Sequence, residues 1–311
     1  MEKLPKIVVI LGPTASGKTN LAISLAKKYN GEIISADSRQ IYQKMDVGTA
    51  KPEGEWKKFR GKKVFVSDSV PYYLVDVADP GNNFTLADFK ARALEHIADI
   101  ISRGKLPFVV GGTGLYLWSI LENLDIPQVA PNLKLRRSLE KKSLPELVTL
   151  LKETDPDSAE KIDLKNTRRV LRALEVFITT GESFFKQRTK STPLFDVLKI
   201  GLIWPKEKLY ARIEQRIDQQ MKQGLEAEVQ KLLKQKYGPI LPSMSSLGYK
   251  QIAAYLRGET TLAQAVENFK RDTRRYAKRQ MTWFKRDKDV IWLLPEEFKK
   301  ADKLINDFLK K

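Results

Sequence analysis

The sequence predicts an α/β fold in which a parallel sheet is flanked by helices and an all-helical segment is inserted between two strands. Strand and helix patterns alternate from the N-terminus to Glu122, strand patterns then stop, and one returns at Val197. Such alternation is typical of βαβ units, whose strands are parallel and buried on both faces. A chain of 311 residues is long enough for one large domain or two ordinary ones.

The strands are predicted from short apolar runs, several of which end at a glycine. The first run, Ile7–Leu11, is rich in β-branched residues and is followed by Gly12, as expected for a buried parallel strand. We predict strands at Lys6–Leu11, Glu32–Ser35, Val64–Val66, Tyr73–Val77, Leu106–Val110 and Val197–Trp204.

The helices of the core are predicted from apolar residues three and four positions apart, such as Leu21 and Leu25. Thr85 is the expected N-cap of the second helix, because its hydroxyl oxygen can accept a backbone N–H from the first turn. We predict core helices at Lys18–Tyr29, Asn83–Arg103, Lys206–Gly224, Leu225–Gln235, Tyr249–Arg257 and Thr261–Lys285.

The segment 125–192 shows only polar amphipathic helix patterns, for example Leu133–Lys142, Pro145–Glu153 and Thr167–Thr180. We therefore expect two domains. Residues 1–124 and 193–311 form the core with its basic C-terminal helices, and residues 125–192 form a helical insertion domain.

Composition narrows the possible functions. The chain has 56 Lys and Arg against 38 Asp and Glu, a net charge of +18, which favours a polyanionic partner. It has no cysteine, and His96 is its single histidine, so disulfides, thiolate zinc sites and Ser-His or His-metal clusters are excluded. No signal peptide or membrane-length apolar segment is recognised, and we expect a cytoplasmic monomer without membrane contact.

A phosphate-binding motif, G-x-x-x-x-G-K-[ST], follows the first strand and opens the first helix. It consists of Gly12, Pro13, Thr14, Ala15, Ser16, Gly17, Lys18 and Thr19. Its backbone N–H groups point at anionic oxygens, Lys18 adds a positive charge, and the Thr19 hydroxyl can bind Mg²⁺. The motif predicts a P-loop NTPase-like core that binds a diphosphate. Ala15 replaces a glycine of many nucleotide kinases, so the motif alone does not establish a nucleoside triphosphate.

Two further segments follow predicted strands at the same sheet edge. Asp37 comes directly after the second strand, and a glycine-rich run containing Thr113 follows the strand that ends at Val110. Because ligands of open α/β sheets bind at the carboxyl ends of strands, we expect Asp37 near the phosphates as a base or an outer-shell metal ligand. The alternative is a carboxylate that only stabilises a turn.

Together with motifs further along the chain, these segments resemble the tRNA dimethylallyltransferases. The motifs occur in family order over nearly the whole chain: GPTASGKT, ADSRQIYQKMDVGTAKP, VVGGTGLY, RRVLRALE, RIEQR, LGYKQ and KRQMTWFK. The chain departs from the family at Tyr72-Tyr73, where histidines are expected.

The resemblance implies transfer of the dimethylallyl group from dimethylallyl diphosphate to N6 of adenosine 37, next to the tRNA anticodon. Diphosphate is released and N6-isopentenyladenosine forms, with Mg²⁺ as cofactor. Asp37 is the implied base for the adenine amine, Thr19 the implied Mg²⁺ ligand, and Arg216 the implied group that stabilises the departing diphosphate. The resemblance also implies that Thr113 lies at the substrate adenosine.

The implied RNA partner is the anticodon stem-loop, whose target base must leave its stack to reach a buried site. The residues expected at tRNA are Asp37, Ser38, Arg39, Gln40, Thr113, Arg136, Arg168, Arg169, Arg172, Gly248, Tyr249, Lys250, Lys278, Arg279, Trp283 and Lys285. The last four belong to a basic C-terminal helix that also includes Arg274. The alternative is a solvated basic helix whose aromatic residues, Trp283 and Phe284, face the core.

Three other functions stay open from the sequence. A P-loop nucleotide or shikimate-type kinase shares the loop and Mg²⁺, but it does not account for the helical insertion or the basic helix. A prenyltransferase acting on free adenine nucleotides shares the catalytic motifs and needs the RNA-binding parts less. A non-catalytic RNA-binding module is disfavoured by the intact P-loop and Asp37.

Overall fold

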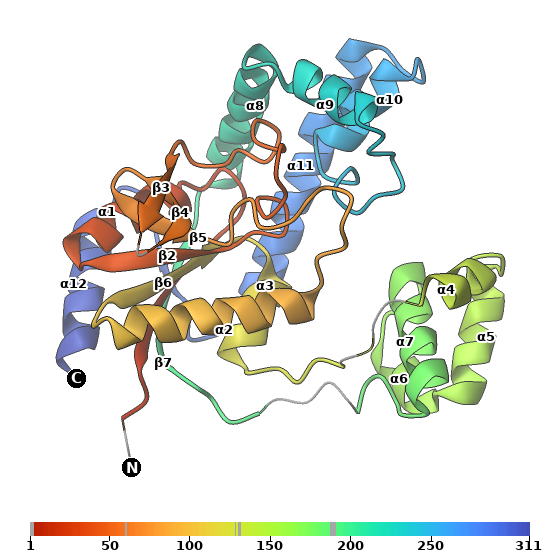
Figure 1. Ribbon diagram of the computed structural model, residues 1–311, viewed down its shortest axis with the longest axis horizontal. Helices are drawn as coiled ribbons and strands as arrows, with labels where there is room; N and C mark the ends of the chain where they lie inside the picture. The colour runs from red at the N-terminus through yellow and green to blue at the C-terminus, as the bar shows by residue number, and fades with distance from the viewer. Residues whose placement is uncertain (1–2, 60, 128, 130–131, 187–190) are drawn as a thin grey trace. The chain divides into compact units, whose positions relative to one another are not determined.

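A single sheet with strand order β3-β4-β5-β2-β6-β1-β7-β8 forms the centre of the computed structural model (Figure 1). The structure describes residues 3–59, 61–127, 129, 132–186 and 191–311. The strands are Lys6–Leu11 (β1), Gly31–Ala36 (β2), Glu55–Phe59 (β3), Lys62–Ser67 (β4), Val70–Tyr73 (β5), Leu106–Gly111 (β6), Asp196–Leu202 (β7) and Ile291–Leu293 (β8). The helices before residue 122 and after residue 195 are Lys18–Lys28 (α1), Leu86–Ser102 (α2), Gly114–Leu121 (α3), Lys206–Lys222 (α8), Leu225–Lys234 (α9), Tyr249–Leu256 (α10), Leu262–Phe284 (α11) and Phe298–Lys310 (α12).

The predicted α/β class is confirmed, and most of the sheet is parallel. β1 pairs in parallel with β6 and β7, β2 with β5 and β6, and β7 with β8. The edge of the sheet formed by β3, β4 and β5 is antiparallel instead. Neither β3 nor β8 was predicted from the sequence. β3 reads as a polar segment because an edge strand has one side without a neighbour, and β8 has only three residues.

The predicted strand Tyr73–Val77 is wrong in position. The strand β5 ends at Tyr73, and the chain then turns through left-handed conformations at Leu74 (φ 61°) and Asp76 (φ 54°). The Asp76 N–H donates to the Gln40 carbonyl at 3.1 Å, and its carboxylate pairs with the buried Lys51 ammonium. These long-range contacts draw an apolar, strand-like run into a loop.

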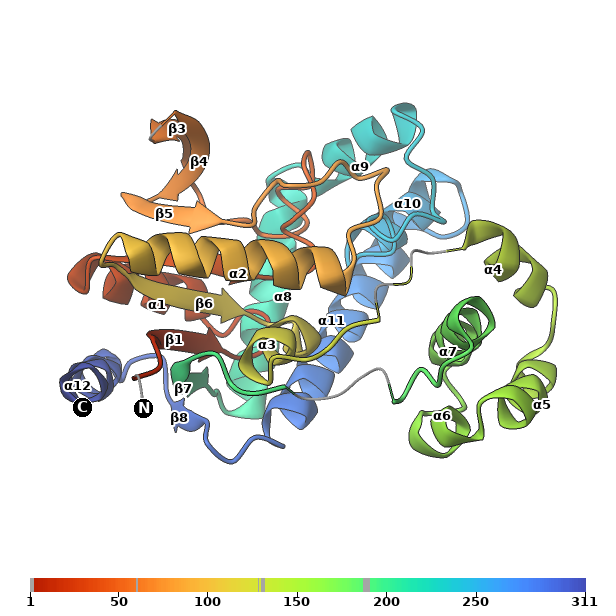
Figure 2. The same ribbon diagram turned by 60° about the horizontal axis from the view of Figure 1, so that its bottom comes forward.

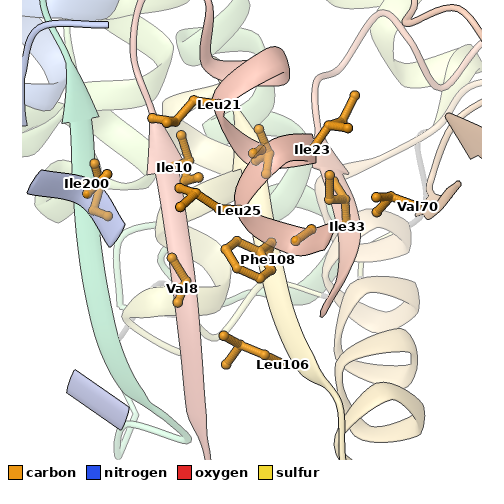
Figure 3. Packing of buried hydrophobic residues seen from close by; sticks show 14 of the residues in the cluster. Val8, Ile10, Leu21, Ile23, Leu25, Ile33, Val70, Leu106, Phe108 and Ile200 are labelled. Carbon is orange, nitrogen blue, oxygen red and sulfur yellow. The ribbon is translucent and has the colours of Figure 1, made fainter. Parts of the chain in front are cut away.

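The core of the sheet lies under α1. Side chains of β1, β2 and β6, among them Val8, Ile10 and Phe108, pack against Leu21 and Leu25 of α1 (Figure 3). On β2 and β6 the sheet also contacts α2, whose capping box at Thr85 confirms the predicted N-cap (Figure 2). This packing fixes the ends of β1, β2 and β6, from which the site is built.

The chain divides into two compact units, one formed by Met1–Leu117 and Leu194–Lys311 and the other by Trp118–Pro193. The second unit contains Leu133–Leu139 (α4), Leu144–Thr154 (α5), Pro156–Lys161 (α6) and Thr167–Thr180 (α7). These helices have their own core, with Leu147, Leu151, Val170 and Leu174 fully buried. Each begins at a polar residue that can accept a backbone N–H: Asn132, Ser143, Asp155 and Asn166. None of the helices in the described part of the chain has the length and apolar character of a membrane span.

A buried carboxylate, Glu32 near the start of β2, binds three side chains at the end of the sheet opposite the carboxyl ends of its parallel strands. It accepts two hydrogen bonds from the Arg103 guanidinium (2.5 and 2.6 Å), one from Lys105 (2.7 Å) and one from the Tyr73 hydroxyl (2.7 Å). Burial acts to raise the Glu32 pKa, but these donors outweigh it and lower the pKa to about 2. The ionised form is therefore the one that the folded state stabilises.

Glu32→Gln is expected to lower the free energy of unfolding by about 3 kcal/mol at neutral pH, because it leaves the Arg103 charge without its main partner. The folded pKa lies below the ordinary value of 4.5, so this stabilisation is present above pH 4.5 and is lost as the pH falls toward 2. Denaturant unfolding at several pH values measures it. Glu95→Gln, at an exposed position of α2, is the matched control. Equal stability of Glu32→Gln and the wild type at pH 7 would contradict the account.

Candidate functional site

The phosphate loop lies between the end of β1 and the start of α1, as its motif predicts. Gly17, at φ 91°, is the residue before the helix, and Ala15 also adopts a left-handed conformation at φ 62°. Glycine tolerates such a φ without strain, whereas alanine does so only when its surroundings hold it. Ala15 therefore needs support from the rest of the fold.

Three side chains from distant segments of the chain provide that support. The Arg212 Nε of α8 donates to the Ala15 carbonyl at 3.0 Å, and the indole N–H of Trp204 donates to the Ser16 carbonyl at 3.0 Å. From α11, the Gln280 Oε1 accepts the Thr14 N–H at 2.9 Å, while its Nε2 donates to the Gly112 carbonyl at 2.8 Å. The loop is thus fixed on both sides by side chains that begin about 190 residues or more away in sequence.

Two cations and one carboxylate share the pocket beside this loop. Lys18, Arg216 and Asp37 all line it. Burial lowers the Lys18 pKa to about 8, with Asp37 acting to raise it and Arg216 to lower it further. Burial also lowers the Arg216 pKa, against the effect of Asp37. The pocket therefore has a surplus of positive charge, which suits an anionic ligand.

The ends of β2 and β6 bring Asp37 and Thr113 to the same edge. The Asp37 Oδ1 accepts the N–H groups of Arg39 (2.8 Å) and Gln40 (3.4 Å), so the carboxylate stabilises its own turn while lining the pocket. Thr113 donates its N–H to the Ala36 carbonyl (3.2 Å) and accepts the Ser38 N–H on its hydroxyl (3.1 Å). Asp37 thus stabilises a turn and also lines the pocket, and its role as a base or metal ligand stays a prediction.

Two tyrosines complete the pocket, and neither was assigned to the site from the sequence. Tyr72, near the end of β5, is 3% exposed and lines the pocket. Burial, and then the nearby Asp37 charge, raise the Tyr72 pKa. Tyr276 of α11 also lines the pocket, and burial raises its pKa to about 12. Tyr276 and Gln280 are four residues apart, so a helix places them on one face. This spacing was the sequence signal that could have assigned α11 to the pocket.

The loop after Tyr42 forms another wall. Glu228 of α9 accepts the backbone N–H groups of Asp46, Val47 and Gly48 at 2.9, 2.8 and 3.1 Å, and it also accepts the Tyr249 hydroxyl at 2.5 Å. A side chain at Gly48 would meet the Tyr249 ring, because an added Cβ would lie 2.4 Å from it. These contacts hold Thr49 and Ala50 at the pocket. The full lining is Thr14, Lys18, Thr19, Ser35, Asp37, Gln40, Thr49, Ala50, Tyr72, Val110, Gly111, Arg216, Tyr276 and Gln280.

Several residues expected at tRNA serve as internal supports in this structure. Tyr249 is fully buried, and Gly248, at φ 88°, packs closely against Phe269. The Gln40 amide is 8% exposed and donates to the carbonyls of Ala50 (3.2 Å) and Thr49 (3.4 Å). Arg39 donates to the Pro242 carbonyl at 2.6 Å. These contacts support the loops around the site, a role for which the linear sequence has no signal.

The basic side chains of helix α11 are of two kinds, those in ion pairs and those that are exposed. Arg274 is ion-paired with Glu214 (2.5 Å) and Glu267 (3.2 Å), so it is not available as a simple phosphate contact. Lys278, Arg279 and Lys285 are exposed, whereas Lys250 on α10 is exposed but 3.4 Å from Asp272. Of the two aromatic residues that were left undecided, Phe284 is fully buried, and Trp283 is half-buried against Gly114.

In the helical unit, the four arginines expected at tRNA are likewise either ion-paired or exposed. Arg136 and Arg172 both bind the buried Glu175 carboxylate, Arg136 through two hydrogen bonds of 2.8 Å and Arg172 through one of 2.6 Å. Burial acts to raise the Glu175 pKa, but these arginines outweigh it and lower the pKa. Arg168 and Arg169, at the start of α7, are exposed. This unit therefore uses two arginines for its own folding.

Two family models match the chain. The IPP transferase model covers residues 40–287, and the isopentenyl transferase model covers residues 5–68. The tRNA dimethylallyltransferase of Acetivibrio thermocellus is 45% identical, over 98% of this chain and 96% of that protein. The tRNA dimethylallyltransferase 2 of Geotalea uraniireducens is also 45% identical, over 94% of each chain.

Solved structures of tRNA prenyltransferases are also similar to this chain. The full-length tRNA isopentenylpyrophosphate transferase of Bacillus halodurans superposes with a TM-score of 0.71 at 36% identity, covering 98% of this chain and 97% of that one. A eukaryotic dimethylallyltransferase, captured in crystallographic snapshots acting on tRNA, gives a TM-score of 0.80 at 27% identity. It covers 98% of this chain, and this chain spans 80% of its length.

Proposed function

Since the chain belongs to the tRNA dimethylallyltransferase family, we propose that its pocket transfers a dimethylallyl group from dimethylallyl diphosphate to N6 of adenosine 37 in tRNA. The bond between the allylic carbon and the diphosphate oxygen breaks, and a bond from that carbon to N6 forms. Diphosphate leaves, and the N6 proton passes to a base. The observation that supports this most is the meeting of Lys18, Arg216 and Asp37 in one pocket.

The phosphate loop and the two cations bind and activate the donor. Backbone N–H groups at the start of α1 point toward anionic oxygens, and Lys18 and Arg216 add full charges in a buried setting. Charge on the diphosphate oxygen grows as the allylic bond breaks. Cations that are already in place lower the barrier, because they need no reorganisation as this charge develops.

Asp37 accepts the proton from the adenine amine. The hydrogen bonds from the Arg39 and Gln40 N–H groups to Oδ1 hold the carboxylate still, and we assign proton acceptance to Oδ2. Tyr276, which lines the pocket, and Thr113, whose hydroxyl accepts the Ser38 N–H one residue after Asp37, are proposed to border the adenine.

Mg²⁺ is the proposed cofactor. The residues fit it, because the Thr19 hydroxyl and the Asp37 carboxylate both line the pocket where the diphosphate would lie. Within the described residues there is no cluster of three or more acidic or histidine side chains. That composition suits Mg²⁺, which is commonly held by few protein ligands together with water and substrate phosphates. When bound, the ion would neutralise charge on the diphosphate.

The anticodon stem-loop of tRNA is the proposed RNA partner, and the exposed cations Lys278, Arg279 and Lys285 on α11 and Arg168 and Arg169 on α7 are its proposed phosphate contacts. We propose that the protein acts as a monomer. Its RNA substrate makes the cytoplasm the proposed location.

Lys278→Ala with Lys285→Ala is expected to weaken binding to all tRNAs alike. The slope of log affinity against log salt should flatten by about 0.7 to 0.9 for each phosphate that the protein no longer neutralises. Filter binding over a salt series measures this slope. The control is Lys299→Ala with Lys303→Ala on α12, which removes the same charge from exposed positions. A weaker affinity with an unchanged slope would mean that Lys278 and Lys285 do not bind phosphates.

A comparison of acceptors tests the proposed function. The protein is incubated with dimethylallyl diphosphate and Mg²⁺ together with unmodified tRNA, AMP or ATP. We expect prenylation of tRNA and little reaction with AMP. Preferential prenylation of AMP would identify a transferase for free nucleotides, and hydrolysis of ATP without prenyl transfer would identify a kinase-like or ATPase function.

A further inference from the structure

Two side chains from outside the phosphate loop, Trp204 and Arg212, bind consecutive carbonyl groups within it. The Arg212 Nε donates to the Ala15 carbonyl at 3.0 Å, and the Trp204 indole N–H donates to the Ser16 carbonyl at 3.0 Å. The guanidinium carbon of Arg212, an exposed residue of α8, lies over the Trp204 ring, 4.7 Å from its centre. The two side chains therefore also hold each other in place.

Ala15 is the residue of the loop that requires such contacts. Its φ of 62° lies in the left-handed region, where the Cβ of a residue other than glycine is too close to the backbone. Many nucleotide kinases have glycine at this position, and glycine adopts this φ without that cost. With alanine here, other interactions must offset the cost if the loop is to keep its shape.

We propose that Arg212 and Trp204 are positioning residues that compensate for alanine at position 15 and keep the phosphate loop in the conformation that binds the diphosphate. Neither side chain is among those that line the pocket, so both act through the loop backbone. This inference rests on the proposed function, because it takes the diphosphate of the donor as the ligand of the loop.

The orientation of the two carbonyl groups decides which loop atoms an anion meets. In a trans peptide the C=O and the following N–H point in opposite directions. Because the Ser16 carbonyl is directed at Trp204, the Gly17 N–H points away from Trp204. If either carbonyl turned toward a bound phosphate, its negative end would repel the anion. The two hydrogen bonds hold both oxygens at donors outside the pocket lining.

The hydrogen bond from Arg212 and the conformation of Ala15 depend on each other. The direction of the Ala15 carbonyl is set by the ψ angle of Ala15 itself, so rotation of this residue out of the left-handed region moves the acceptor away from Arg212. Without Arg212, a smaller fraction of the molecules has the binding conformation, and the apparent affinity for the ligand falls by that fraction.

Substitution of Arg212 in two backgrounds tests this dependence. Mg²⁺-dependent binding of inorganic pyrophosphate is measured by calorimetry. In the wild-type background, Arg212→Met should weaken binding by about three- to tenfold, as loss of one hydrogen bond from a charged donor predicts. In the Ala15→Gly background it should weaken binding by less than about twofold, because glycine needs no support at this φ. Affinities are compared within each background, so the effect of Ala15→Gly itself cancels.

The positive charge of Arg212 is separated from its positioning role by the same cycle. A long-range attraction between Arg212 and pyrophosphate would be lost equally in both backgrounds. Lys208→Met is the matched control, because it removes one positive charge from an exposed position one turn earlier on α8. Its effect on pyrophosphate binding should be small and equal in the two backgrounds.

Trp204→Phe tests the second hydrogen bond. Phenylalanine retains an aromatic ring for the Arg212 guanidinium but has no N–H for the Ser16 carbonyl. We expect weaker pyrophosphate binding and a higher KM for dimethylallyl diphosphate, with the affinity for tRNA unchanged. A general loss of stability would instead lower the amount of active protein and leave the KM as it is.

Wild-type pyrophosphate affinity in both Arg212→Met and Trp204→Phe would overturn the proposal, and so would an equal loss from Arg212→Met in the two backgrounds. These binding measurements do not require catalysis. A wild-type protein that binds Mg²⁺-pyrophosphate but makes no prenylated adenosine would therefore refute the proposed function and leave the result for Arg212 interpretable.

Discussion

Asp37→Asn is expected to slow prenyl transfer by about a hundredfold to ten-thousandfold, because it removes the base that accepts the N6 proton. Asparagine retains an oxygen that can accept the N–H groups of Arg39 and Gln40, so the turn should keep its shape. Single-turnover rates with saturating tRNA and donor measure the chemical step directly. Binding of tRNA and of dimethylallyl diphosphate should stay close to that of the wild type.

Asp68→Asn is the control for this substitution. Asp68 lies in the turn between β4 and β5 and forms an exposed ion pair with Lys27, so its removal should leave the transfer rate unchanged. A near wild-type rate for Asp37→Asn would show that Asp37 only stabilises its turn, and another group would have to accept the proton.

Arg216→Gln is expected to lower kcat by about a hundredfold to a thousandfold, with a smaller effect on donor affinity. Arg216 is a half-buried cation that shares the pocket with Lys18, and the charge it is proposed to stabilise grows only as the allylic bond breaks. An interaction that strengthens in the transition state acts on kcat rather than on ground-state binding.

Rates with tRNA at saturating donor, together with the Kd for pyrophosphate, distinguish the two effects. Arg257→Gln is the control, because it removes a guanidinium that pairs with Glu259 at the end of α10. If Arg216→Gln changes the Kd as much as it changes kcat/KM and leaves kcat intact, Arg216 contributes only uniform binding.

The parts of the donor site that consist of contiguous sequence motifs were predictable from the sequence. The phosphate loop is a contiguous motif between a strand and a helix, and Asp37 follows the next strand. The carboxyl ends of parallel strands meet at one edge, which brings these segments together without further information. Arg216 was assigned to the site only by resemblance, since nothing in its helix pattern separates it from other arginines of α8.

The supports of the site were not predictable, because they depend on contacts between distant segments. Tyr249 and Gln40 were expected at tRNA, but each is buried and holds the loop that ends at Ala50. Periodicity alone identifies an apolar or polar face and not the partner that the face meets. The same limit applies to Tyr72, whose strand was predicted to begin one residue later, at Tyr73.

Charge patterns were informative about the kind of partner and less so about single residues. The surplus of Lys and Arg favoured a polyanion, yet Arg136, Arg172 and Arg274 are ion-paired with glutamates of the protein. The pairs of Arg136 with Glu175 and of Arg274 with Glu214 join different helices, so spacing along the sequence does not reveal them. The binding of the exposed cations to tRNA stays a prediction, for which the salt dependence is the test.

The most direct test of the proposed activity is the identity of the modified nucleoside and its position. Unmodified tRNA with adenosine at position 37, and the same tRNA with guanosine there, are each incubated with the protein, dimethylallyl diphosphate and Mg²⁺. They are then digested to nucleosides and analysed by mass spectrometry. The account predicts N6-isopentenyladenosine from the first tRNA and none from the second. Prenylated adenosine from both tRNAs, or from neither, would contradict it.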